Sequence, residues 1–173
     1  MLKEVGSLKA YHSSENFEAR GICEQDIEKN KNVIISLLES NYKINFPDLK
    51  NVSEIAQCSY EDMLRFTKNK SAILIGIFVD SYMTGFVWSY LRNVFSENRI
   101  HINHLVIDEK YRGIGMGTAL INALRVRASE LGIKTIDLMT SSKNIRALRF
   151  YETHGFKNAR VQMEMRLGEQ SDN

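Results

Sequence analysis

The residues best suited to chemistry lie between His101 and Thr118, where two histidines are followed by an arginine and three alternating glycines. The glycines form the segment Arg112-Gly-Ile-Gly-Met-Gly117, between an apolar run and a helical pattern. Glycines at a strand-to-helix turn let an anion approach the unpaired amides of the first helical turn, where the helix dipole favours negative charge. Arg112, directly before the first glycine, adds a positive charge at the edge of this loop. The pattern predicts a phosphate-binding loop.

Spacing excludes two common nucleotide-binding motifs. A P-loop requires a lysine between its last glycine and Ser/Thr, whereas Thr118 follows Gly117 directly. A dinucleotide fingerprint requires glycine or alanine where this chain has Thr118 or Leu120. Taken alone, the glycines fit equally well a turn that packs a helix tightly on a strand.

A second motif, Asn144-x-x-Ala147-x-x-Phe150-Tyr151-x-x-x-Gly155-Phe156, begins 27 residues after Gly117. Both motifs at this spacing resemble the GNAT-type N-acetyltransferases, which use acetyl-CoA. The detailed match covers residues 99–156, and the coarse order of elements extends it over 17–167. The resemblance implies an α/β fold with a mixed, mostly antiparallel central sheet flanked by helices. It also implies a splayed strand pair that holds the pantetheine arm of CoA.

The resemblance implies a CoA site built largely from backbone. The amides of the glycine loop would hold the CoA pyrophosphate with Arg112 at its head, and the loop residues are Gly113, Ile114, Gly115, Met116, Gly117 and Thr118. The backbone of Leu105, Val106 and Ile107 would pair with the pantetheine arm, and an amide there would polarise the thioester carbonyl. Glu109 departs from the proline frequent in the family, and we expect only a local effect.

Three positions of the second motif complete the implied site. Asn144 would contact the pantetheine arm or an ordered water, and Tyr151 would protonate the leaving thiolate. Ala147 and Tyr151 lie one helical turn apart on the same face, and the small residue leaves room for a slender ligand arm. Outside this pattern, Tyr151 would be interpreted as a core aromatic.

Acetyl transfer to an amine requires a base, because an alkylammonium has a pKa near 10.4 by analogy with lysine. Alternation along "IHINHLVI" predicts that His101, Asn103 and Leu105 share one face of a strand and that Ile102, His104 and Val106 share the other. In the family, the base or a water-positioning residue often lies four or two places before the pantetheine-pairing segment, which implies His101 or Asn103. His101 is the better candidate, because histidine has a reference pKa near 6.5. His104 and Glu97 are alternatives, and either histidine could be purely structural.

Composition indicates a single globular domain of ordinary type. The chain has 173 residues, of which 43% are hydrophobic and 25% charged, with a net charge of +2. We expect a domain over 16–168, an N-terminal extension over 1–15 and a polar tail over 169–173. The small net charge does not favour nucleic acid, and no stretch approaches the length of a membrane span. With no export signal, a cytoplasmic location is expected.

The pattern of apolar residues predicts the order of elements. Helices are expected from Asp26 as N-cap, over 59–69 from a capping box at Ser59, after the glycine loop up to Gly132, and from Asn144 to before Gly155. Strands are expected over 17–23, 71–80, 84–92, 99–107, 133–140 and 157–167.

The acceptor is less well determined than the co-substrate. In the family the first two helices and nearby strands build its site, and the available side chains are Tyr42, Phe46, Tyr60, Trp88, Tyr90, Glu61 and Asp62. Most of these are explained more simply as core or surface. The leading hypothesis is a small amine, such as an amino sugar, aminoglycoside, polyamine or amino acid, that attacks directly within a ternary complex.

The alternatives are a protein N-terminus or lysine as acceptor, or a CoA-binding regulatory module without turnover. A homodimer is possible. Neither a metal nor a cysteine nucleophile is expected, because Cys23 and Cys58 lie far from the motifs and lack metal-ligand spacing.

Overall fold

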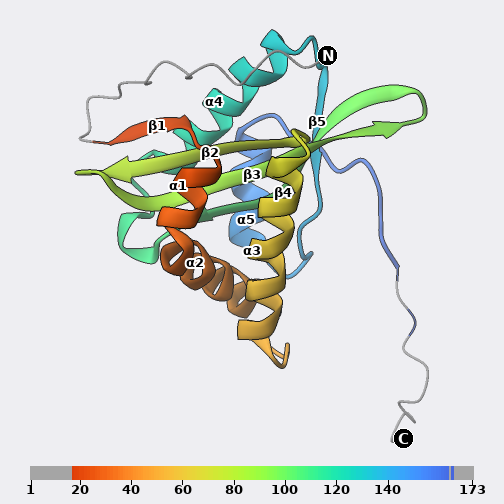
Figure 1. Cartoon of the computed structure of the whole chain (residues 1–173). Coiled ribbons are helices and arrows are strands. Elements are labelled where there is room, and N and C mark those ends of the chain that lie inside the picture. Colours follow the sequence, from red (N-terminus) through yellow and green to blue (C-terminus); the bar gives the residue numbers. More distant parts are fainter. Residues whose placement is uncertain (1–16, 164, 166–173) are drawn as a thin grey trace, which may run out of the picture.

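The computed structural model describes residues 17–163 and 165 and contains one mixed sheet with helices on both faces (Figure 1). In chain order the elements are β1 (Glu18–Gly21), α1 (Glu24–Lys29), α2 (Lys31–Asn45), α3 (Val52–Lys68), β2 (Ala72–Val79), β3 (Tyr82–Val94), β4 (Glu97–Ile107), the short 3₁₀ helix η1 (Glu109–Tyr111), α4 (Met116–Glu130), β5 (Thr135–Leu138) and α5 (Ile145–Thr153). The spatial strand order is β1-β2-β3-β4-β5. Neighbouring strands are antiparallel except for β4 and β5, which are parallel. The predicted mixed, mostly antiparallel sheet is therefore confirmed.

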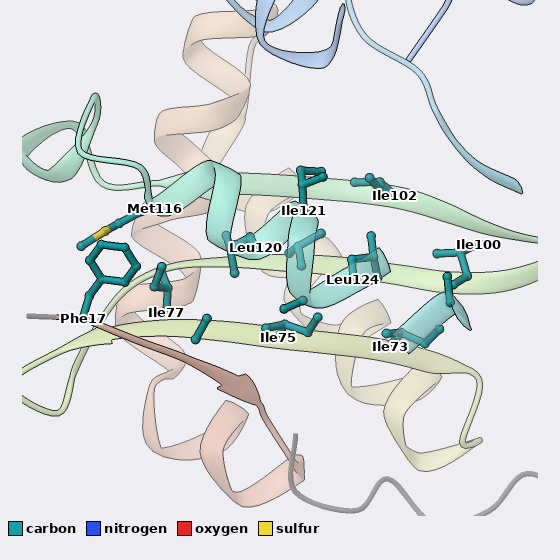
Figure 2. Close-up of a cluster of buried hydrophobic side chains, with 14 residues drawn as sticks. Phe17, Ile73, Ile75, Ile77, Ile100, Ile102, Met116, Leu120, Ile121 and Leu124 are labelled. Carbon is teal, nitrogen blue, oxygen red and sulfur yellow. The ribbon is translucent and has the colours of Figure 1, made fainter. Parts of the chain in front are cut away.

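Two hydrophobic cores sandwich the sheet. In one, α4 places Met116, Leu120 and Leu124 over the isoleucines of β2 and β4, as Figure 2 shows. In the other, the buried residues of α2 and α3 cover the opposite face, and they pack on Leu74, Phe78, Phe86, Trp88 and Val106. β2 and β3 are buried on both faces because helices cover each side, which explains why they form continuous apolar runs.

The hairpins of the sheet are tighter than the sequence pattern predicts. Asp80 and Ser81 connect β2 to β3 with φ values of 46° and 68°, and Phe95 and Ser96 connect β3 to β4 with 52° and 65°. Two central residues with positive φ match the twist of the flanking strands. β3 consequently begins at Tyr82 and not at residue 84.

The first helix starts before Asp26, so the predicted N-cap is wrong. Cys23 is the N-cap residue, and its backbone N–H donates to the Asp26 carboxylate at 3.0 Å. Asp26 also accepts two hydrogen bonds from Arg20, at 2.9 and 3.1 Å, which is the main reason its pKa falls to about 2. The helical region then divides at Asn30 into α1 and α2.

The capping box predicted at Ser59 is also wrong. α3 begins at Val52, after Asn51 in the left-handed conformation, and Ser59 lies in its interior. The Ser59 hydroxyl hydrogen-bonds to the Tyr42 hydroxyl of α2 at 2.7 Å, so it serves tertiary packing and not a helix end. The predicted ends of the later helices are close to the observed ones: Gly132 follows α4, and α5 ends at Thr153.

The strand predicted over 157–167 does not form in the described residues, because 157–163 is irregular. Val161 and Met163 are 87% and 90% exposed. Alternation shows which faces a strand would have, but a strand also needs an edge to pair with, and β5 is a short strand over only Thr135–Leu138. The predicted extension 1–15, the tail 169–173 and position 168 lie outside the described residues. Within the described part, none of the helices is long and apolar enough to cross a membrane.

Candidate active site

The glycine loop joins η1 to α4 through two left-handed glycines. Gly113 has φ +89° and Gly115 has φ +88°, a region that side chains rarely adopt. Gly115 is the N-cap residue of α4 and provides no side-chain cap. These two glycines set the path of the loop.

The backbone amides of this loop are free to bind a ligand. Within the described residues, the N–H groups from Gly113 to Thr118 donate to no protein acceptor, and the first hydrogen bond of α4 runs from Ala119 N to Gly115 O at 3.0 Å. Consecutive unpaired amides at a helix N-terminus form an anion-binding site. The loop therefore presents unpaired amides at the start of α4, and phosphate binding by them stays a prediction.

Side chains around the loop hold it in place. Arg112 Nε donates to the Ile107 carbonyl at 3.1 Å, which ties the loop to the end of β4. His154 Nδ1 lies 2.7 Å from the Phe150 carbonyl, and its Nε2 lies 3.1 Å from the Thr118 hydroxyl. His154 therefore links α5 to α4.

Two of the predicted loop residues also have packing roles. A Cβ atom on Gly117 would lie 3.1 Å from the Phe150 ring, so this glycine permits the close approach of α4 and α5. Met116 is 1% exposed and its side chain lies in the core, so the side chain is not available to a ligand. The Ile114 side chain is exposed.

β4 and β5 separate beside this loop. Their pairing runs from Arg99 and Thr135 to Ile102 and Leu138, whereas β4 continues to Ile107. On its other edge β4 contains a bulge, because Trp88 pairs with His104 and Ser89 pairs with Ile102. The extra residue, Asn103, has no counterpart on β3. The splayed strand pair that the resemblance implies is thus present, with the Leu105–Ile107 backbone beyond the last pair.

The bulge overturns the predicted face assignment along β4. Ile100 and Ile102 lie in the α4-side core, so His101 between them faces α2 and α3. Beyond Asn103 the alternation is inverted: Leu105 packs on the α4 side and His104 stacks on Trp88 at 5.5 Å. His101 and His104 therefore share one face, because an inserted residue shifts every later side chain to the opposite side.

His101 is buried and forms a short contact with a carboxylate of β5. Its Nδ1 lies 2.6 Å from Asp137 Oδ1, and its side chain is 5% exposed. The Tyr90 ring of β3 lies 5.3 Å from the imidazole. Asp137 also accepts from Arg92 at 2.7 Å and lies 3.8 Å from Arg99.

The two alternative bases, His104 and Glu97, both have hydrogen-bond partners within the protein. Asn41 Nδ2 lies 3.2 Å from His104 Nδ1, and the Tyr42 hydroxyl lies 3.4 Å from His104 Nε2. Burial lowers the pKa of His104 to about 4. Glu97 accepts hydrogen bonds from the Thr135 hydroxyl at 2.5 Å and from Arg99 at 2.8 Å. These bonds, that from Thr135 first, lower the pKa of the Glu97 carboxyl and make it a weaker base.

The second motif forms the start and the inner face of α5. Asn144 caps the helix by accepting from Ala147 N at 3.0 Å, and its Nδ2 donates to Asn45 Oδ1 of α2 at 2.7 Å. Both ends of the Asn144 side chain thus have protein partners, and its contact with pantetheine stays a prediction. Ala147 is half-buried beside it.

Tyr151 packs on the α4 side of the sheet with Leu105, Ile107 and Leu138, the residues that flank the separation of β4 and β5. Burial raises its pKa to about 12, so the phenol keeps its proton at neutral pH. Tyr151 and His101 therefore lie on opposite faces of the sheet.

The residues considered for the acceptor site are dispersed. Tyr60 and Trp88 are core residues, 4% and 2% exposed. Glu61 lines an open hollow on α3 with Arg65 and Lys68, and Asp62 pairs with Arg65. Phe46 is exposed after the end of α2. Of this group, Tyr42 and Trp88 contact His104, and Tyr90 contacts His101.

Sequence reasoning missed Asp137, Asn41 and Asn45, which contact His101, His104 and Asn144 respectively. Asp137 carried a detectable signal, because it is the one carboxylate within the apolar run of β5. The two asparagines carried none, because their partners lie 63 and 99 residues away. Among the described residues, no cluster of three or more His, Cys, Asp or Glu side chains is placed to hold a metal ion.

The buried, neutral His104 predicts a pH-dependent stability. Between pH 6.5 and 4 the unfolded chain binds a proton at this histidine and the folded chain does not, so protonation favours unfolding. The free energy of unfolding, measured by urea denaturation, should fall by roughly 3 kcal/mol in total as the pH drops through this window. His104→Gln should lose that part of the slope, and equal slopes in both proteins would contradict the prediction. Asp26, whose pKa is about 2, also stabilises the folded state, and this stabilisation is lost only as the pH falls below about 3.8.

Comparison with known proteins places this geometry in a family. The profile of the acetyltransferase (GNAT) family matches residues 34–156. The spermine/spermidine N(1)-acetyltransferase of Bacillus subtilis is 31% identical over 88 residues, which cover 48% of this chain and 58% of that protein. The mycothiol acetyltransferase of Propionibacterium freudenreichii is 32% identical over 74 residues, which cover 43% of this chain and 24% of that protein. The chain thus spans less than two thirds of these relatives.

Solved structures share the fold. A GCN5-related N-acetyltransferase from Ralstonia eutropha superposes with a TM-score of 0.73 and 16% identity, covering 88% of this chain and 99% of that chain. An aminoglycoside acetyltransferase from an uncultured soil metagenomic sample, in complex with trehalose, superposes with a TM-score of 0.68 and 16% identity. The superposition covers 89% of this chain and 98% of that chain. With the family profile spanning both motifs, the protein belongs to the GNAT family of acetyltransferases.

Proposed function

We propose that this protein transfers an acetyl group from acetyl-CoA to a primary amine of a small molecule. The observation that carries the proposal is the set of unpaired amides from Gly113 to Thr118, next to Arg112 and to the point where β4 and β5 separate. A diphosphate at the amides and an extended arm along the free edge of β4 together match the shape of CoA.

Acetyl-CoA supplies an activated acetyl group as a thioester. Its pyrophosphate fits the loop because six consecutive amides and the dipole of α4 favour an anion there. Its pantetheine arm fits the backbone of Leu105, Val106 and Ile107, which lies beyond the last pair with β5. An amide of this segment would donate to the carbonyl oxygen as negative charge develops.

His101 is the base that we favour. It lies on the α2 and α3 face, and Asp137 accepts its Nδ1–H, which leaves Nε2 to accept a proton from the amine, directly or through water. His104 is less suitable because both of its ring nitrogens have protein partners and its pKa is about 4. Glu97 is less suitable because hydrogen bonds stabilise its ionised form.

Tyr151 is the group that we assign to protonating the leaving thiolate. Its raised pKa keeps the phenol protonated at neutral pH, which is the state that a proton donor requires. Because His101 and Tyr151 lie on opposite faces of the sheet, the acceptor would approach from the α2 and α3 side. The thiolate would then leave toward the α4 side, and direct attack in a ternary complex needs no acyl-enzyme.

The sequence relative named as a spermine/spermidine acetyltransferase supports a small amine as acceptor. A protein N-terminus or lysine, and CoA binding without turnover, are the competing outcomes of the test below. The cytoplasmic location and a homodimer stay predictions.

A substrate screen tests the proposal. The protein is incubated with acetyl-CoA and a panel of polyamines, amino sugars, aminoglycosides, amino acids and peptides, and free thiol is measured over time. Mass spectrometry then identifies the acetylated product. We expect turnover on at least one small amine. Turnover on peptides alone would favour a protein acceptor, and tight CoA binding with no turnover on any amine would favour a binding module.

Gly113→Ala should weaken CoA binding by roughly tenfold, because the added Cβ strains a residue at φ +89° in the loop that carries the unpaired amides. Gly132→Ala is the matched control, since Gly132 also has a positive φ, +68°, and a Cβ added there would meet no atom within 4 Å. Both substitutions should lower thermal stability to a similar extent. Isothermal titration with CoA should separate them, and equal affinities would contradict the assignment of the loop.

Tyr151→Phe should lower kcat by about 10- to 100-fold while leaving KM for acetyl-CoA nearly unchanged, because only the proton donor is removed. Tyr111→Phe is a suitable control, since Tyr111 packs against the same core and loses the same hydroxyl. Steady-state kinetics of both variants on the best amine test this role. Undiminished turnover of Tyr151→Phe would remove Tyr151 from the mechanism.

A further inference from the structure

We infer that Asp137 is the positioning residue for His101: it fixes the imidazole as the Nδ1–H tautomer and so presents Nε2 as the proton acceptor. The inference rests on the proposed function for its catalytic consequence. Its geometric basis is the distance of 2.6 Å between His101 Nδ1 on β4 and Asp137 Oδ1 on β5, two strands that pair in parallel.

The register of β4 and β5 makes this contact possible. His101 and Asp137 are direct partners in the ladder, and both side chains leave the sheet on the α2 and α3 face, since Ile136 and Leu138 pack with Ile100 and Ile102 on the other. This pair stands one residue before the last pair, Ile102 and Leu138. The carboxylate thus holds the imidazole beside the point at which the two strands separate.

The charge state of Asp137 fits an acceptor role. Burial opposes its ionisation, but the hydrogen bonds from Arg92 and His101 outweigh burial and lower its pKa. An ionised carboxylate accepts only, so the ring nitrogen that faces it must carry the hydrogen. The other ring nitrogen is then unprotonated in the neutral imidazole, as a base requires.

Charged groups around the pair limit what Asp137 can do. Arg92 of β3 lies 2.7 Å from the same Oδ1, Arg99 of β4 lies 3.8 Å from Oδ2, and Glu97 is bound to Arg99 and Thr135. Tyr90 is the ionisable group that packs on the imidazole. Two arginines offset much of the negative charge of Asp137. The contribution of Asp137 is therefore the orientation and tautomer of the ring more than a strong attraction for its proton.

The first test needs no substrate. Long-range ¹H–¹⁵N spectra of the full chain with ¹⁵N-labelled histidine report which ring nitrogen carries hydrogen, and His101→Gln assigns the signals among the four histidines. We expect His101 in the Nδ1–H form in the wild-type protein and a mixture of tautomers in Asp137→Ala. A wild-type His101 protonated at Nε2 would overturn the inference, whether or not the enzyme has been assigned an amine.

The second test is kinetic. Asp137→Ala should lower kcat by about 10- to 100-fold and change the acid limb of the pH–rate profile, with KM for acetyl-CoA within about twofold of wild type. Asp137→Asn keeps an oxygen acceptor, so it should retain the Nδ1–H tautomer and an intermediate kcat. A kcat and pH profile of Asp137→Ala equal to those of wild type would refute the positioning role while leaving the acetyltransferase activity in place.

Glu130→Gln is the matched control, because it neutralises a carboxylate that, like Asp137, pairs with an arginine, here Arg127 of α4 at 2.8 Å. It should preserve both the tautomer and kcat. If it reduced kcat as much as Asp137→Ala does, the effect would reflect the loss of any arginine-paired carboxylate and the inference would fail. Circular dichroism of each variant checks that the fold is retained.

Discussion

The site depends on the bulge at Asn103 and the separation of β4 from β5 that begins at the same level. One inserted residue inverts the side-chain alternation of β4, so His101 and His104 share the α2 and α3 face. At the next level the ladder with β5 stops, and β4 continues with one free edge. A continuous sheet would have used that edge for strand pairing, so the irregularity leaves the edge free for the extended ligand that we propose.

The glycine loop is held in its shape by contacts that do not use its amides. Arg112 bonds to the end of β4, His154 joins Thr118 to α5, and Gly117 lets Phe150 approach α4. Because these contacts involve side chains and carbonyls, the amides themselves stay available. A loop that is already in its binding conformation loses less conformational entropy when an anion binds. His154 and Phe150 connect this loop to α5, which carries Tyr151.

Sequence patterns predicted elements best where they reflect local physics. The glycine loop, the end of α4 before Gly132 and the start of α5 after Asn144 were predictable, because backbone conformation and capping depend on neighbouring residues. Predictions failed where the structure of a segment depends on contacts with residues distant in the sequence. Asp26 binds Arg20 and lies inside its helix, Ser59 bonds to Tyr42, and the segment 157–163 has the alternation of a strand without the pairing. The prediction that His101 and His104 lie on opposite faces of the sheet was wrong, because a bulge leaves no local signature in "IHINHLVI".

By itself, the sequence determined the family, the order of most elements and the position of the glycine loop at which we propose that an anion binds. These follow from the spacing of residues along the chain, and spacing is a local property. Only the tertiary structure decided that His101 lies against Asp137, that His104 is enclosed by α2 and Trp88, and that Tyr151 lies across the sheet from both. Those relations depend on strand register and on helix packing. A shift of one residue in register reverses which side chains meet, and only the folded chain determines the register.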